Sequence, residues 1–130
     1  MRLIREFMAA LQLLLEGKDL EHRREELKKL YEQYIGPYEL YHNATIDVAM
    51  RALASYDEGQ RLERMEMLAE LYYAEADTVT GPDRNLLLDK AFNLFSFIER
   101  NGKTFSMDRR YKMALIEQRL KKCSGKTRCE

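Results

Sequence analysis

The sequence predicts an all-α fold, and three observations support that prediction. The 130-residue chain is rich in the helix-favouring residues Leu, Ala, Glu, Lys, Arg and Met, and it has only two prolines and six glycines. Apolar residues recur at intervals of three and four along most of the chain. Turn and capping signals divide these stretches into about six helices. We therefore expect antiparallel helical hairpins, forming one domain over residues 1–122.

Residues 2–16 predict an amphipathic helix with an unusually wide apolar face. Glu6 and Gln12 interrupt the apolar run, so we expect neither a secretory signal nor a membrane-spanning helix here. Gly17 is expected to end the helix in a left-handed cap, and Asp19 to cap the next helix. The apolar face consists of Leu3, Ile4, Phe7, Met8, Leu11, Leu14 and Leu15.

This apolar face has three possible uses. It can complete the core of its own domain, as most amphipathic helices do. It can instead pair with another protein or with a second copy of the chain, because terminal helices are often loosely attached. Binding flat on a membrane surface is the third use, although the polar face mixes positive and negative charges where such anchors favour Lys and Arg.

The rest of the chain predicts five further helices. The second covers residues 20–35, and an irregular, aromatic-rich connection is expected over residues 36–44. Thr45, Asp57, Asp83 and Ser106 are the expected N-caps of the remaining four helices. In the helix after Asp57, the side chains of Glu63, Glu66, Glu70, Glu75 and Asp77 are expected to form a solvated acidic face.

Two of these segments carry a resemblance to a known repeat. "LAELYYAEA" followed by "DKAFNLFSFI" resembles the helix pair of a tetratricopeptide repeat, with Ala69 and Tyr72 on the first helix and Ala91 and Phe95 on the second. The order of helices along the chain is also similar to small tetratricopeptide-like bacterial proteins that lack a known function. The resemblance implies a helical-hairpin fold and no particular activity.

Charge is unevenly distributed in a chain whose formal net charge is zero. Residues 57–79 carry seven acidic and two basic side chains, whereas residues 102–130 carry nine basic and three acidic ones. Cys123 and Cys129 lie in a polar tail, residues 123–130, that we expect to be disordered. Because so few cysteines favour a reducing compartment, we predict a cytoplasmic protein.

The sequence contains no recognisable catalytic, cofactor or metal motif. His22 and His42 lie on separate segments, and "SGKT" near the end lacks the glycine, strand and helix of a phosphate-binding loop. We therefore expect no cofactor and no metal, and a non-enzymatic role. Nucleic acid is not an expected partner, because the basic tail lacks interleaved aromatic residues.

These observations favour a protein-binding or self-associating module, a homodimer included, that uses the apolar face of the first helix. The first alternative is a small-molecule-binding or enzymatic domain with a tyrosine-rich pocket. The second is recruitment of an acidic partner by the basic tail. The pocket of the first alternative would contain Tyr31, Tyr34, Tyr38, Tyr41, Tyr72 and Tyr73.

Overall fold

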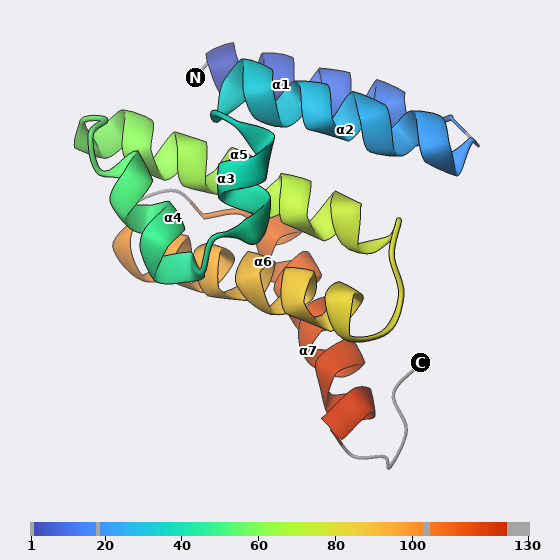
Figure 1. Cartoon of the computed structure of the whole chain (residues 1–130). Helices are drawn as coiled ribbons and strands as arrows, with labels where there is room; N and C mark the ends of the chain where they lie inside the picture. The colour runs from blue at the N-terminus through green and yellow to red at the C-terminus, as the bar shows by residue number, and fades with distance from the viewer. Residues whose placement is uncertain (1, 18, 103–104, 125–130) are drawn as a thin grey trace.

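The computed structural model describes residues 2–17, 19–102 and 105–124, and all regular secondary structure within these ranges is helical. The predicted all-α fold is therefore confirmed, with seven helices in the described ranges instead of about six (Figure 1). They are α1 (Arg2–Leu15), α2 (Leu20–Tyr34), α3 (Tyr38–Asn43), α4 (Ile46–Leu53), α5 (Glu58–Ala76), α6 (Gly81–Asn101) and α7 (Met107–Ser124).

The additional helix is α3, which lies where the sequence predicted an irregular connection. Pro37 precedes it with φ −56°, and the Tyr41 N–H donates to the Pro37 carbonyl at 3.3 Å. The fixed φ of proline suits the start of a helix, so Pro37 both ends α2 and begins α3. Gly36 allows this tight junction, because a Cβ there would lie 2.7 Å from the ring of Tyr41.

Four helices begin at the predicted capping residues. The side chains of Asp19, Thr45, Asp57 and Ser106 each accept a hydrogen bond from a backbone N–H in the first turn that follows. Such caps satisfy amide groups that have no partner within the helix.

Two predicted caps are wrong. Gly17 does not adopt the left-handed conformation; its N–H donates to the Leu14 carbonyl at 3.2 Å in an ordinary turn. The left-handed glycine is Gly81, with φ 64°, at the start of α6. Consequently α6 begins before Asp83, which lies in the first turn, where its charge favours the positive end of the helix.

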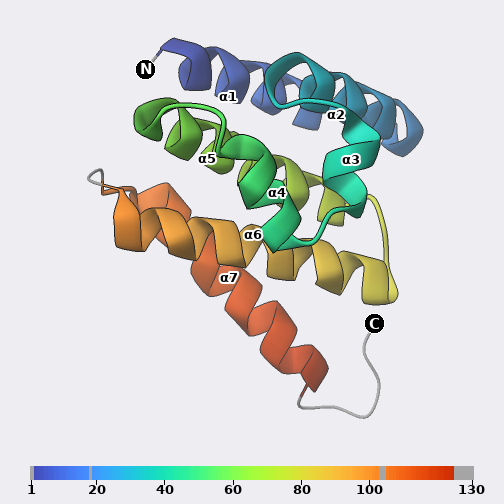
Figure 2. The same ribbon diagram turned by 60° about the vertical axis from the view of Figure 1, so that its left-hand side comes forward.

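The helices are arranged around a central α5–α6 hairpin (Figure 1). The α1–α2 hairpin packs against α5, and α7 packs against α6 on the opposite side. Figure 2 shows the short helices α3 and α4 crossing one edge of this stack. A disordered tail was predicted over residues 123–130, but α7 continues to Ser124, so residues 123 and 124 are helical. Residues 125–130 lie outside the described residues.

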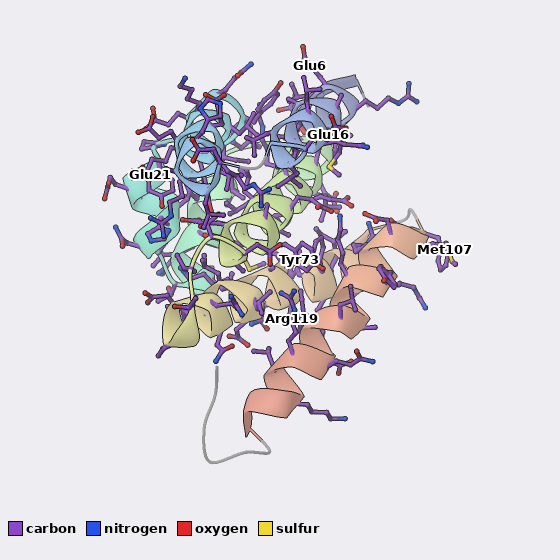
Figure 3. The ribbon with its side chains drawn as sticks, turned by 90° about the vertical axis from the view of Figure 1, so that its right-hand side faces the viewer. Glu6, Glu16, Glu21, Tyr73, Met107 and Arg119 are labelled. Atoms are coloured by element: carbon purple, nitrogen blue, oxygen red, sulfur yellow. The ribbon has the colours of Figure 1, made fainter. Side chains whose placement is uncertain are left out.

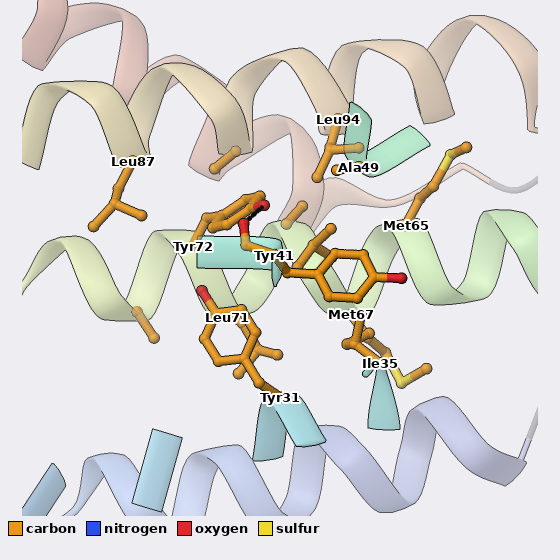
Figure 4. Close-up of a cluster of buried hydrophobic side chains, with 14 of the residues drawn as sticks. Tyr31, Ile35, Tyr41, Ala49, Met65, Met67, Leu71, Tyr72, Leu87 and Leu94 are labelled. Atoms are coloured by element: carbon orange, nitrogen blue, oxygen red, sulfur yellow. Dashed lines mark hydrogen bonds between the residues drawn. The ribbon is translucent and has the colours of Figure 1, made fainter. Parts of the chain in front are cut away.

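Helix α5 lies at the centre of the core. Tyr31 of α2 and Tyr72 of α5 are fully buried, and Figure 4 shows them in the cluster between α5 and its neighbours. Ala69 of α5 and Ala91 of α6 are also fully buried. Small residues allow two helix backbones to approach closely. On α1, Phe7 joins the same core, with its ring edge against Tyr34 at a centroid distance of 5.2 Å.

Two leucines on α1 provide a matched test of this packing. Leu11 is 3% exposed and Leu13 is 72% exposed. We expect Leu11→Ala to lower the free energy of unfolding by about 2–5 kcal/mol, because it leaves a cavity in the core. Leu13→Ala should change it by less than about 0.5 kcal/mol. Urea denaturation followed by circular dichroism measures both, and equal losses would contradict the burial of this face of α1.

Candidate functional site

Two cavities lie one after the other along α5, between α1 and α7. The first has a volume of about 700 Å³ and the second about 470 Å³. We call the surface that lines them the α1–α7 groove. Its residues are Ile4, Met8, Leu11, Gln12, Leu15, Glu16, Glu58, Gly59, Leu62, Glu63, Glu66, Glu70, Tyr73, Ala74, Ile98, Asn101, Gly102, Phe105, Ser106, Asp108, Arg109 and Lys112.

One wall of the groove is a row of apolar side chains on α1. Ile4, Met8, Leu11 and Leu15 are spaced by four, three and four residues, which places them along one side of the helix. Leu11 is almost completely buried, whereas Leu15 is 37% exposed. The row is therefore most buried at Leu11 and most exposed at Leu15.

The other residues of the predicted partner-binding face lie outside this row. Phe7 is fully buried in the core, and Leu3 and Leu14 are partly buried against it. The predicted face is thus divided between the core and the wall of the groove. Its use by a partner stays a prediction.

The opposite wall, α7, is fixed to α5 and α6 by ion pairs. Arg109 is buried; its Nε lies 2.6 Å from a Glu99 oxygen, and its Nη1 lies 3.2 Å from a Glu66 oxygen. One turn further along α7, Lys112 Nζ lies 2.7 Å from a buried Glu70 oxygen. Since buried charges are costly unless they are paired, these contacts determine where α7 lies on α5.

These ion pairs shift the pKa values of their members. Burial raises the pKa of Glu99, but the hydrogen bond and charge of Arg109, with the charge of Arg110, outweigh it and lower that pKa overall. For Glu70 the balance is reversed: burial keeps its pKa above the ordinary value despite Lys112. Burial also acts to lower the pKa of Lys112, but the neighbouring Glu70 raises it overall.

The start of α1 is attached to α5 by a polar contact. The Ile4 N–H donates to Glu63 Oε2 at 3.0 Å, across 59 residues of sequence. A carboxylate next to the first turn of a helix is favoured by the partial positive charge there. Figure 3 views the molecule from the side on which α1 ends, with Glu16 of α1 above, α7 below and Tyr73 of α5 between them.

A second polar cluster lies on the other side of α5. Tyr73 and Glu75 are two residues apart, about 200° around the helix, so Glu75 points away from the groove. Its carboxylate is buried. One oxygen accepts a hydrogen bond from the Tyr31 hydroxyl at 2.7 Å; the other accepts one from the Tyr38 hydroxyl at 2.6 Å and lies 2.9 Å from His42 Nδ1. A cavity of about 280 Å³ adjoins this cluster.

The two tyrosines of this cluster donate hydrogen bonds to Glu75. Burial, together with the charge and hydrogen bond of Glu75, raises the pKa of Tyr31 well above its ordinary value. The same causes raise the pKa of Tyr38. Both hydroxyls therefore stay protonated at neutral pH, and each donates its hydrogen to Glu75.

The six tyrosines of the predicted pocket lie in the core and beside two different cavities. Tyr31, Tyr34, Tyr41 and Tyr72 are buried in the core, where the Tyr72 hydroxyl donates to the Tyr41 carbonyl at 2.5 Å. Tyr38 lines the cavity beside Glu75, and Tyr73 lines the α1–α7 groove.

Some polar residues of both sites differ from the prediction. Glu70 and Glu75 were expected on a solvated face of α5, but they are only 3% and 5% exposed, so that prediction is wrong for both. His42 was expected in an irregular connection, but it lies in the last turn of α3. Its position four residues after Tyr38 was the available signal, since that spacing stacks the two rings in a helix, at 5.0 Å between centroids.

Comparison of the chain with family models, curated proteins and solved structures found no match. Within the described ranges, no helix has both the length and the apolar character needed to cross a membrane. The same ranges contain no group of three or more His, Cys, Asp or Glu side chains arranged to hold a metal ion.

The lowered pKa of Glu99 predicts a pH-dependent contribution to stability. Its ion pair stabilises the fold above the ordinary glutamate pKa of about 4.3, and that contribution disappears as the pH falls through the lowered folded-state value. Glu99→Gln should therefore destabilise the protein at neutral pH and do so progressively less towards about pH 3. Denaturant titrations across this range measure the difference.

Glu117→Gln is the control, because Glu117 is exposed on α7. It should leave stability nearly unchanged throughout the range. A difference between wild type and Glu99→Gln that is the same at neutral and acidic pH would contradict the assigned charge interaction.

Proposed function

We propose that this chain is a protein-interaction module that binds a basic amphipathic helix in the α1–α7 groove. The observation that carries the proposal is the pair of cavities along α5, with an apolar row on one wall and carboxylates around it. A helix that places its apolar side into such a groove is a recurring mode of peptide recognition.

The dimensions of the groove support a short helical ligand. The apolar row extends from Ile4 to Leu15, which at about 1.5 Å per residue is roughly 16 Å, or three turns of helix. Phe105 adds an exposed aromatic side chain at the α7 end. A partner segment of about three turns with apolar residues at three- and four-residue intervals would match this length.

The charge of the groove supports a basic ligand. Six carboxyl groups line the two cavities, against two cationic side chains. Both cations, Arg109 and Lys112, are already engaged with carboxylates. Glu16 and Glu58 lie at opposite ends of the groove and form no ion pair with another described residue. Complementary charge accelerates association and selects among partners.

The resemblance to a tetratricopeptide helix pair is part of this proposal. Ala69, Tyr72, Ala91 and Phe95, which carry the resemblance, are all fully buried on α5 and α6. Stacked helical hairpins of that kind present a concave binding surface. That the protein is cytoplasmic and bacterial remains our prediction. A second copy of this chain could also occupy the groove through its basic C-terminal part, and the experiment below distinguishes this case.

The groove predicts selective loss of binding when its exposed apolar wall is changed. The probe is a fluorescent peptide of about three turns, with leucines along one side and lysines elsewhere. We expect saturable binding, weakened about tenfold or more by Leu15→Asp, which puts a charge against the apolar side of the peptide. Leu13→Asp, on the exposed side of the same helix, should leave affinity unchanged. Fluorescence anisotropy measures both.

The acidic ends of the groove predict a dependence on salt. Glu16→Lys combined with Glu58→Lys should weaken binding and flatten its decline with rising salt, because fewer charges are then screened. Glu21→Lys, an exposed change outside the groove on α2, is the control.

The proposal is refuted if Leu13→Asp weakens the affinity for the peptide as much as Leu15→Asp does. It is also refuted if a peptide with glutamates in place of the lysines binds as tightly as the lysine peptide. Light scattering in the absence of peptide tests whether a second copy of the chain binds in the groove. If the protein is a dimer and Leu15→Asp dissociates it, the ligand of the groove is a second chain and not a partner helix.

A further inference from the structure

His42 is held in an unusual way for a partly exposed histidine. Its Nδ1 lies 2.9 Å from Glu75 Oε2, and 3.1 Å from the Tyr38 hydroxyl oxygen. Because the Tyr38 hydroxyl donates its only hydrogen to Glu75, it can only accept from the imidazole. Nδ1 must therefore carry a hydrogen, and that fixes both the tautomer and the orientation of the ring.

This arrangement leaves Nε2 of His42 available for a ligand. Within the described part of the chain, Nε2 has no hydrogen-bond partner, and the His42 side chain is 34% exposed. It lines the cavity of about 280 Å³ together with Arg24, Lys28 and Thr78. A buried carboxylate behind one imidazole nitrogen is the usual means of orienting the other nitrogen towards a ligand.

We propose that this cavity binds a phosphate group, with Arg24 and Lys28 as hydrogen-bond donors to its oxygens and His42 Nε2 as the acceptor of a phosphate hydroxyl. The proposal concerns the opposite side of α5 from the α1–α7 groove and does not rest on the proposed function. The ligand class is a small phosphate-bearing anion, either free phosphate or a phosphate monoester.

The charges around the cavity favour an anion. Arg24 uses one guanidinium nitrogen on the Thr78 carbonyl at 2.7 Å, which holds its side chain in place. Lys28 lies over the ring of Tyr38, with Nζ 5.3 Å from the centroid. Behind the site, Lys90 Nζ donates to the His42 carbonyl at 2.9 Å and adds positive charge.

The one carboxylate in the cavity does not oppose this assignment. Glu75 is 5% exposed, and its two oxygens already accept hydrogens from two tyrosines and from His42. The volume of the cavity is at the lower limit for drug-sized ligands, which suits a group as small as phosphate.

The test follows the imidazole nitrogens of the full chain by NMR after labelling its histidines with ¹⁵N. The chain has two histidines, so His22, exposed on α2, is an internal reference. Inorganic phosphate and O-phosphoserine are the two probes. We expect a saturable shift of His42 Nε2 and no change at His22.

Two lysine variants complete the test. Lys28→Ala should weaken the affinity for the probe about tenfold, since it removes a charged donor. Lys29→Ala, the adjacent exposed lysine, which pairs with Glu26 and not with the cavity, should leave it unchanged. Both positions are exposed, so both variants should fold, and circular dichroism verifies this.

The outcomes separate the possibilities. Tighter binding of O-phosphoserine than of inorganic phosphate assigns a phosphate monoester, and tighter binding of inorganic phosphate assigns free phosphate; each supports a phosphate site. The proposal is overturned if His42 shows no saturable shift, if His22 shifts in parallel, or if Lys28→Ala and Lys29→Ala behave alike.

Discussion

Two buried carboxylates on α5 are the constraint on which the packing of the other helices depends. Glu70 and Glu75 are five residues apart, so they leave the helix in different directions, and both are almost inaccessible to water. A charge in a protein interior costs several kcal/mol unless it is paired and hydrogen-bonded. α7 supplies Lys112 to the first carboxylate, whereas α2 and α3 supply two tyrosines and a histidine to the second. The position of the helices around α5 therefore depends on these ion pairs and hydrogen bonds as well as on apolar packing.

The same constraint produces the two candidate sites. On one side of α5, the ion pairs of Arg109 and Lys112 hold α7 away from the row of apolar side chains on α1, and the groove lies between them. On the other side, the hydrogen bonds to Glu75 set the orientation of His42 beside a small cavity. Each surface therefore owes its geometry to a polar contact inside the molecule.

Local patterns predicted the helices well because capping and periodicity act over a few residues. Asp19, Thr45 and Asp57 each cap the helix that was assigned to them. The predictions that are wrong concern effects from distant parts of the chain. Glu75 was expected in solvent because its own helix gives no sign of Tyr31, which is 44 residues away in sequence. Likewise, the apolar face of α1 could be recognised from spacing, but its division between core and groove depends on where α5 and α7 lie.

Leu11 belongs both to the hydrophobic core and to the lining of the α1–α7 groove. A substitution of Leu11 would therefore change both the stability of the fold and the shape of the groove. Anything that occupies the groove binds only the folded form of α1, so it raises the stability of the whole chain by mass action. α1 would then exchange its amide hydrogens more slowly in the complex than in the free protein.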